Sequence, residues 1–259
     1  MHQVWQEVKV SGDTAYHMNT TVPRRVFTIG GGATMRKLLP VLLVAWVLAR
    51  ATSPLPCTAE AACSRPDPLQ PAQGCTVLYA TDGEVMLGGN NEDYVNPLTK
   101  VWFIPGEGGS FGRVYFGFSD YHAQGGMNEQ GLFFDGLGLS TTLPVSKEGK
   151  QEYAGNLVDK AMAECATVEC VVGLFEQYYA NDSWHWQFLF GDASGESAIF
   201  EAQEILRQRG GYQVATNFLQ SATPPEARTC WRYRTAVEEL ESMETLSVEA
   251  MRDVLDAVH

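Results

Sequence analysis

A cysteine and an aspartate stand where a short hairpin would bring them together. Cys75 begins a run of β-forming residues, and Asp93 follows a second such run. The dipeptide Asp82-Gly83 between the runs tolerates the positive backbone angles of a tight turn, so the sequence predicts antiparallel strands over 75–80 and 85–89. Such a hairpin would return Asp93 to the neighbourhood of the Cys75 thiol.

The residue before this cysteine indicates how its thiol could be activated. Gly74 leaves room for the chain to be cut, and a cut there would give Cys75 a free α-amine. A thiol reacts as its thiolate and has an ordinary pKa of about 8.5, whereas an α-amine with a pKa of about 7.7–8.0 is partly neutral at physiological pH. The amine can therefore accept the thiol proton, directly or through water, with Asp93 orienting it. The alternative is that Asp93 bonds backbone at a strand end.

Three segments resemble a known superfamily. Gly-Cys-Thr at 74–76, the Asp-Gly turn and Gly-x-Asn-x-Asp-Tyr at 89–94 are similar to the start of the mature enzyme in the isopenicillin-N acyltransferase family of N-terminal-nucleophile (Ntn) hydrolases. They are more loosely similar to penicillin V acylases and bile-salt (choloylglycine) hydrolases. Gly-Met-Asn-Glu-x-Gly-Leu at 126–132 and Thr-Asn at 216–217 also match, in the family's order.

The resemblance implies roles for four residues. Cys75 would be the nucleophile, Asp93 its partner, and the Asn217 side-chain amide a donor of the oxyanion hole, a contribution worth about 10²–10³ in rate. The alternative for Asn217 is a turn asparagine. Arg232, in Trp-Arg-Tyr-Arg, loosely resembles a late arginine that supports the nucleophile, but its distance from Asn217 is shorter than in the family, and a helix-surface position is the alternative.

The chain departs from the family at two positions. Bile-salt hydrolases and penicillin V acylases carry an arginine where Asn90 stands. A positive charge is therefore missing from the expected pocket, which disfavours bile salts and penicillins as substrates. The penicillin V branch has an asparagine where Gly138 stands, which leaves only a backbone N–H to contribute. Asn91 matches the family as a supporting residue, and Tyr94 is among the aromatic residues that could line an acyl pocket.

The order of the elements predicts an α+β fold. The resemblance implies the four-layer αββα Ntn-hydrolase sandwich, with two stacked antiparallel sheets, and we expect truncation at the C-terminus because the family usually continues with more strands. Besides the first hairpin, strands are expected over 101–104, 113–118, 131–139, 186–190, 196–202 and 212–217, and helices over 157–165, 168–179, 227–243 and 246–258.

The first 74 residues are expected to be a removable leader. Residues 1–34 show no clear apolar periodicity and are interpreted as an upstream extension. The segment 35–61 starts with basic residues and an apolar run shorter than the roughly 20 residues of a membrane span, which is typical of a secretory signal peptide. The proline-rich segment 62–74 is a linker or pro-segment, and 75–259 is the hydrolase domain. A twin-arginine leader and a retained amphipathic anchor stay open as alternatives.

Composition limits the partners. The chain has 259 residues, 45% of them apolar, and a formal charge of −13. From Cys75 onward, 11 Lys and Arg face 27 Asp and Glu, a net charge of −16 that disfavours nucleic acid. No cysteine spacing resembles a metal site, and no metal or cofactor is expected. After loss of the leader, Cys165, Cys170 and Cys230 are interpreted as small buried apolar residues, with at least one unpaired.

These features predict a secreted cysteine Ntn hydrolase of linear amides that works through a thioester, with no membrane span once the signal is removed. Its partner would be a small-molecule N-acyl amide, and an acceptor amine in place of water would make it an acyltransferase; a homo-oligomer is left open. One alternative is a papain- or transglutaminase-like hydrolase that pairs Cys75 with His122 or His185. Another is a secreted binding module without catalysis.

Overall fold

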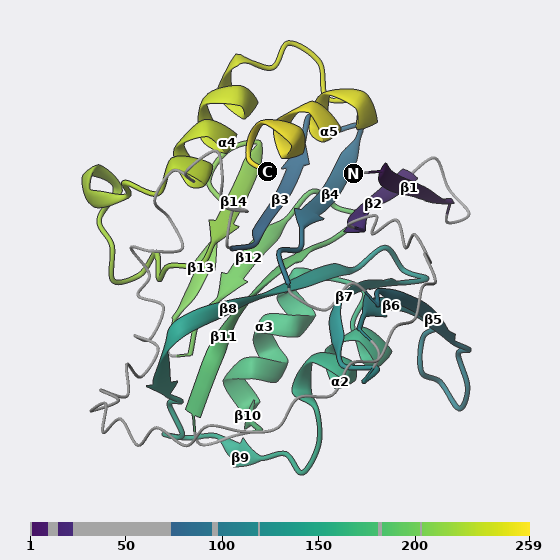
Figure 1. Ribbon diagram of the computed structural model, residues 1–259. Coiled ribbons are helices and arrows are strands. Elements are labelled where there is room, and N and C mark those ends of the chain that lie inside the picture. Colours follow the sequence, from purple (N-terminus) through teal and green to yellow (C-terminus); the bar gives the residue numbers. More distant parts are fainter. Residues whose placement is uncertain are drawn as a thin grey trace, which may run out of the picture.

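Two stacked β-sheets form the centre of the chain. The computed structural model describes residues 2–9, 15–22, 74–94, 98–118, 120–180, 183–202 and 204–259 (Figure 1). The expected signal peptide at 35–61 and the linker up to residue 73 lie outside the described residues. Among those described, no helix is long and apolar enough to cross a membrane.

The larger sheet has seven strands that all pair antiparallel with their neighbours. Its order is β13-β12-β11-β8-β7-β6-β5. Most of its strands carry apolar residues on both faces, as expected for a sheet covered on both sides. The strands are β5 (Lys100–Ile104), β6 (Arg113–Gly117), β7 (Ala123–Asn128), β8 (Phe133–Pro144), β11 (Ser183–Gly191), β12 (Ser197–Phe200) and β13 (Ile205–Arg207).

The smaller sheet contains the predicted hairpin. It has the order β14-β3-β4, with β3 at Thr76–Thr81, β4 at Met86–Asn91 and β14 at Tyr212–Thr216. Asp82 Oδ1 accepts the backbone N–H groups of Glu84 (3.0 Å) and Val85 (2.8 Å), and Gly83 has a φ of 94°. The turn expected from Asp82-Gly83 is confirmed.

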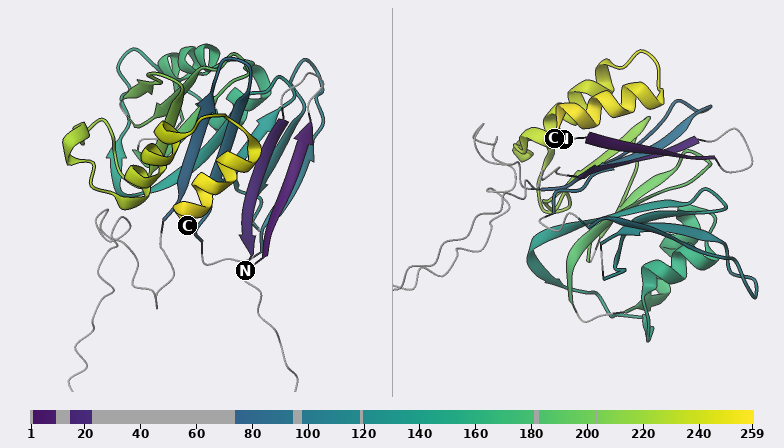
Figure 2. Two further views of the ribbon diagram at one scale, coloured as in Figure 1. Left: turned by 90° about the horizontal axis from the view of Figure 1, so that it is seen from above. Right: turned by 45° about the vertical axis from the view of Figure 1, so that its right-hand side comes forward.

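Helices cover the outer face of each sheet. Helices α2 (Leu157–Glu164) and α3 (Val168–Gln177) pack on the seven-stranded sheet, and α4 (Trp231–Ser242) and α5 (Val248–Ala257) pack on the three-stranded sheet. A third apolar core fills the space between the sheets. Figure 2 shows the resulting order of helices, sheet, sheet and helices, so the αββα sandwich is confirmed.

Several elements were not predicted. Residues 1–34 were assigned no element, yet β1 (His2–Lys9) and β2 (Ala15–Val22) form an antiparallel pair, with β2 beside β4 (Figure 2). Strand β7 was also missed, as was the short parallel pair of β9 (Gln151–Glu152) and β10 (Tyr178–Tyr179). Helix α4 starts at Trp231 rather than 227, because the prolines before it lead into a 3-10 turn at Pro225–Ala227.

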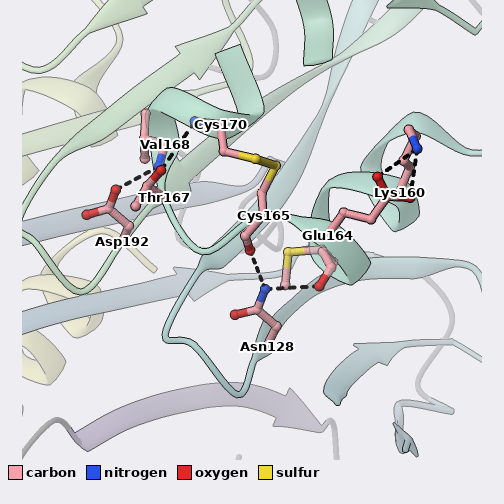
Figure 3. The surroundings of a disulfide bond; sticks show 9 residues. Asn128, Lys160, Glu164, Cys165, Thr167, Val168, Cys170 and Asp192 are labelled. Atoms are coloured by element: carbon pink, nitrogen blue, oxygen red, sulfur yellow. Dashed lines mark hydrogen bonds and ion pairs between the residues drawn. A yellow bond between two sulfur atoms is a disulfide. The ribbon is translucent and has the colours of Figure 1, made fainter. Parts of the chain in front are cut away.

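The interpretation of the cysteines was wrong for two of the three. Cys165 and Cys170 form a disulfide, with Cα atoms 5.4 Å apart, between the end of α2 and the first turn of α3 (Figure 3). Asn128 of the matched 126–132 segment donates to the backbone oxygens of Met162 (2.9 Å) and Cys165 (2.7 Å), so this residue braces the bridge. Cys230 is buried, and its sulfur accepts a hydrogen bond from the Thr216 hydroxyl at 3.5 Å.

Removal of this disulfide should destabilise the fold. Closing so short a loop in the unfolded chain is worth about 2 kcal/mol, so Cys165→Ala combined with Cys170→Ala should lower the free energy of unfolding by about that amount. Urea unfolding with and without a reducing agent measures it. The wild-type midpoint should fall in reductant and that of the double variant should not; a wild-type midpoint that ignores reductant contradicts the prediction.

Candidate active site

Antiparallel pairing gathers the predicted residues at one end of the three-stranded sheet. Cys75 directly precedes β3, while Asp93 follows β4 and Asn217 follows β14. The pairs Thr76–Asn91 and Thr76–Thr216 set the register, so the start of β3 lies between the ends of its two neighbours. Residues far apart in the sequence therefore meet around Cys75.

Strand alternation decides which side of the sheet each side chain occupies. Cys75 packs with Val77 and Tyr79 in the core between the sheets, whereas Leu78 and Ala80 pack against α4 and α5. Thr76 lies on the helix side, where its hydroxyl accepts a hydrogen bond from Arg232 of α4 at 3.3 Å. The Cys75 thiol therefore points between the two sheets, toward β8.

Gly74 occupies a position that only glycine fits. Its φ of 134° is one that L side chains rarely adopt, and an added Cβ would collide with the guanidinium of Arg232 and lie 2.8 Å from Asn217 Oδ1. Its backbone N–H donates to Asp93 Oδ2 at 2.8 Å. The expected cleavage point thus lies among three of the residues that the resemblance named.

Arg232 is a buried residue of the site, and the helix-surface alternative is wrong. Its side chain is 1% exposed, in the first turn of α4. The guanidinium donates to the backbone oxygen of Cys75, to Thr76 Oγ1 at 3.3 Å and to Asn217 Oδ1 at 3.2 Å. Arg232 therefore holds the backbone of the nucleophile and the predicted oxyanion donor together.

Asn217 is oriented by two partners. Because Arg232 occupies its Oδ1, the amide nitrogen points the other way, and it donates to the backbone oxygen of Gly138 at 2.8 Å. An amide nitrogen has two hydrogens, so one donor is left after this bond. The structure brings the carbonyl of Gly138 to the site, whereas the predicted use of its N–H stays a prediction.

Glu92 is the site residue that sequence reasoning missed. Its Oε2 accepts the Cys75 thiol at 3.5 Å, and its Oε1 accepts the Asn90 amide at 3.2 Å. Burial, and secondarily the charge of Asp93, raises the pKa of Glu92 to about 7. The signal lay in the sequence, because Glu92 is two residues from Asn90 on the strand side that faces Cys75.

Asp135 on β8 completes an acidic environment around the thiol. It is fully buried, and neither carboxyl oxygen has a hydrogen-bond partner among the described residues. Burial and the neighbouring Glu92 raise the pKa of Asp135 well above its usual range. Burial, Glu92 and Asp135 likewise raise the pKa of Cys75. Burial also raises the pKa of Asp93, against the bond from Gly74 and the charge of Arg232.

Two predicted supporting residues point elsewhere. Asn91 lies on the helix side of β4 and donates to the backbone oxygen of Leu255 at 2.7 Å, so it anchors α5. Tyr94 is 60% exposed and its ring packs on Phe118. Asn90, by contrast, is buried beside Glu92 and does belong to the site.

The histidines of the alternative mechanism are not brought to Cys75. His122 and His185 are exposed and flank Trp186, and all three line a cavity of about 990 Å³. Residues of α2 also line that cavity, which places it on the outer face of the seven-stranded sheet, opposite the face toward Cys75. Within the described part of the chain, no three His, Cys, Asp or Glu side chains are grouped to hold a metal ion.

Asp135→Asn should weaken the pH dependence of stability. Because the folded pKa is raised, this carboxyl stabilises the fold fully below its unfolded pKa of about 3.8, and that stability is lost as pH rises toward the folded pKa. The loss is at most about 1.4 kcal/mol per pH unit. Urea unfolding at several pH values from about 5 to about 8 should show a smaller decline in the variant; parallel declines would contradict the assignment.

Comparison with solved structures supports the fold. A penicillin V acylase from Agrobacterium tumefaciens matches with a TM-score of 0.54 and 21% identity, over 71% of this chain and 72% of that one. A single-residue variant of a conjugated bile acid hydrolase from Clostridium perfringens matches with a TM-score of 0.51 and 18% identity, over 71% and 79% of the two chains. No protein-family model and no curated protein matches the sequence. At these identities the likeness concerns the fold, and the predicted sandwich of two stacked sheets between helices is shared with both structures.

Proposed function

We propose that this protein is a cysteine Ntn hydrolase of linear amides that becomes active when the chain is cut between Gly74 and Cys75. One observation carries the proposal: Asp93, Asn217 and Arg232, distant in sequence, converge on the Gly74–Cys75 peptide. A purely structural cysteine at a strand start would not need this set of partners.

Different residues carry out the proton transfers, the nucleophilic attack and the oxyanion stabilisation of the proposed reaction. After the cut, the α-amine of Cys75 takes the thiol proton, and Asp93, freed from the Gly74 N–H, accepts a hydrogen bond from that amine. The thiolate attacks the amide carbonyl, and the remaining N–H of Asn217 donates to the developing oxyanion. The ammonium then protonates the departing amine, which leaves a thioester for water to hydrolyse.

The charge around the thiol limits the substrate. Glu92, Asp93 and Asp135 surround Cys75, and the Arg232 guanidinium already serves three acceptors. Asn90 adds no charge where the resembled enzymes have an arginine. A carboxylate close to the scissile bond would be repelled here, so the proposed substrate is an N-acyl amide that is neutral near that bond. An acceptor amine replacing water would give acyl transfer.

A disulfide supports the proposed secretion. The Cys165–Cys170 bridge is of a kind that persists in oxidising compartments and is rare where thiols are kept reduced. It agrees with the expectation of a signal peptide at 35–61 and an extracytoplasmic protein.

The first test is the N-terminal residue of the active protein. Mass spectrometry of the purified protein should find a chain that starts at Cys75, and Cys75→Ala should remain uncut and inactive on a panel of N-acyl amides of varied chain length. An active preparation in which the Gly74–Cys75 bond is intact would overturn the mechanism.

A second test concerns the oxyanion donor. Asn217→Ala should lower kcat/KM by about 10²–10³ in cut protein, because its donor acts on charge that develops in the transition state. Asn156→Ala is the matched control: Asn156 caps α2 on the outer face of the other sheet, so its loss should lower stability by about 1 kcal/mol without affecting kcat/KM. Equal activity in the two variants would remove Asn217 from the mechanism.

A further inference from the structure

The proposed function leaves one step without a base. In the uncut chain the nitrogen of Cys75 is a peptide nitrogen, whose lone pair is delocalised into the carbonyl, so it cannot accept the thiol proton. If the protein cuts itself, another group must take that proton. The uncut chain described here shows which groups surround the thiol at that stage.

One carboxylate already bonds the thiol. Glu92 Oε2 lies 3.5 Å from Cys75 Sγ, within the range of a hydrogen bond to sulfur, and Asn90 holds the other oxygen at 3.2 Å. His122 and His185 are on the far side of the seven-stranded sheet, and His259 acts on Asp93. Asp93 Oδ2 accepts the Gly74 N–H, and Asp135 has no hydrogen-bond partner among the described residues. Glu92 is therefore the group placed to receive the proton.

We propose that Glu92 is the general base for self-cleavage before Cys75, a role separate from that of the α-amine in later turnover. The inference rests on the proposed function, because it supplies the step that creates the N-terminal cysteine. The thiol proton is thus accepted by Glu92 during self-cleavage and by the α-amine of Cys75 during amide hydrolysis.

The step balances as an N-to-S acyl shift. The thiol proton moves to the Glu92 carboxylate, and Sγ forms a bond to the carbonyl carbon of Gly74. The C–N bond of the Gly74–Cys75 peptide then breaks, and Glu92 returns its proton to the departing nitrogen, which becomes the α-amine. Water hydrolyses the thioester, giving the Gly74 carboxylate and the free thiol of Cys75.

The surroundings favour this attack over an unassisted one. The Arg232 guanidinium lies against Gly74 and donates to the backbone oxygen of Cys75, so a positive charge is close to the peptide that is cut. Asn90 fixes the rotamer of Glu92 with its carboxylate on the thiol. Each group is in place before the cut.

The titratable groups that face Glu92 set the direction of the pH dependence. These are Cys75 before β3, Asp93 on its own segment, and Asp135 on β8; Arg232 and His259 act on Asp93. Burial sets the pKa of Glu92 at about 7, and only its ionised form can accept a proton. Self-cleavage should therefore accelerate as pH rises through about 7.

Refolding provides the test. Full-length uncut chain is isolated in denaturant and refolded by dilution, and loss of the Gly74–Cys75 bond is followed by intact mass. Glu92→Gln, which keeps the shape and the acceptor oxygen but not the basicity, should slow the cut by about 100-fold or more and abolish the rise with pH. Glu84→Gln, an exposed change in the β3–β4 turn, should cut at the wild-type rate.

Two further readouts separate the possible outcomes. Hydroxylamine cleaves thioesters, so it should trap the wild-type intermediate as a hydroxamate at Gly74 but not rescue Glu92→Gln, whose block precedes the thioester. Hydrolysis of N-acyl amides by the refolding wild-type protein is the second readout, and it should appear only as the Gly74–Cys75 bond is lost. Cutting of Glu92→Gln at the wild-type rate, or its rescue by hydroxylamine, overturns the assignment alone. Wild-type protein that stays uncut yet hydrolyses amides overturns the proposed function as well.

Discussion

The buried guanidinium of Arg232 is the interaction on which the site depends. A buried charge is costly unless it is paired and fully hydrogen-bonded. Its bonds go to the backbone of Cys75, to Thr76 and to Asn217, and Asp93 supplies the opposing charge. Helix α4 thus cannot settle on the three-stranded sheet in this position without also fixing the nucleophile, so the fold and the site are stabilised by the same contacts.

On the side of β3 that faces away from α4, the Cys75 thiol is surrounded by acidic groups rather than by the guanidinium. Arg232 approaches β3 from the helix side, whereas Asp135 lies between the sheets and Glu92 reaches the thiol. In the uncut chain burial and these carboxyls raise the pKa of Cys75, so the thiol stays protonated until a base takes its proton. A new α-amine beside it would add a base and, once protonated, a positive charge. The same pocket can therefore hold the thiol protonated before the cut and support a thiolate after it.

Local chemistry explains which features were predictable from sequence. The β3–β4 turn follows from Asp82-Gly83, because that signal acts within a few residues. The four-layer αββα arrangement was predicted from the family resemblance and not from local signals. Arg232 was ambiguous, since its burial depends on residues some 150 positions away. The five-residue separation of Cys165 and Cys170 gave no hint of pairing, because their approach requires α2 to end and α3 to begin between them.

Register connects the turn to the chemistry. Because side chains alternate along a strand, a slip of one residue in β3 would turn Cys75 toward the helices and place Thr76 between the sheets. The bonds that Asp82 makes to Glu84 and Val85 close the hairpin at one length, which fixes the pairing of Thr76 with Asn91 at the opposite end. The thiol then meets Glu92 rather than Arg232. A turn at the far end of the hairpin, well away from the nucleophile, thus decides which charge the nucleophile faces.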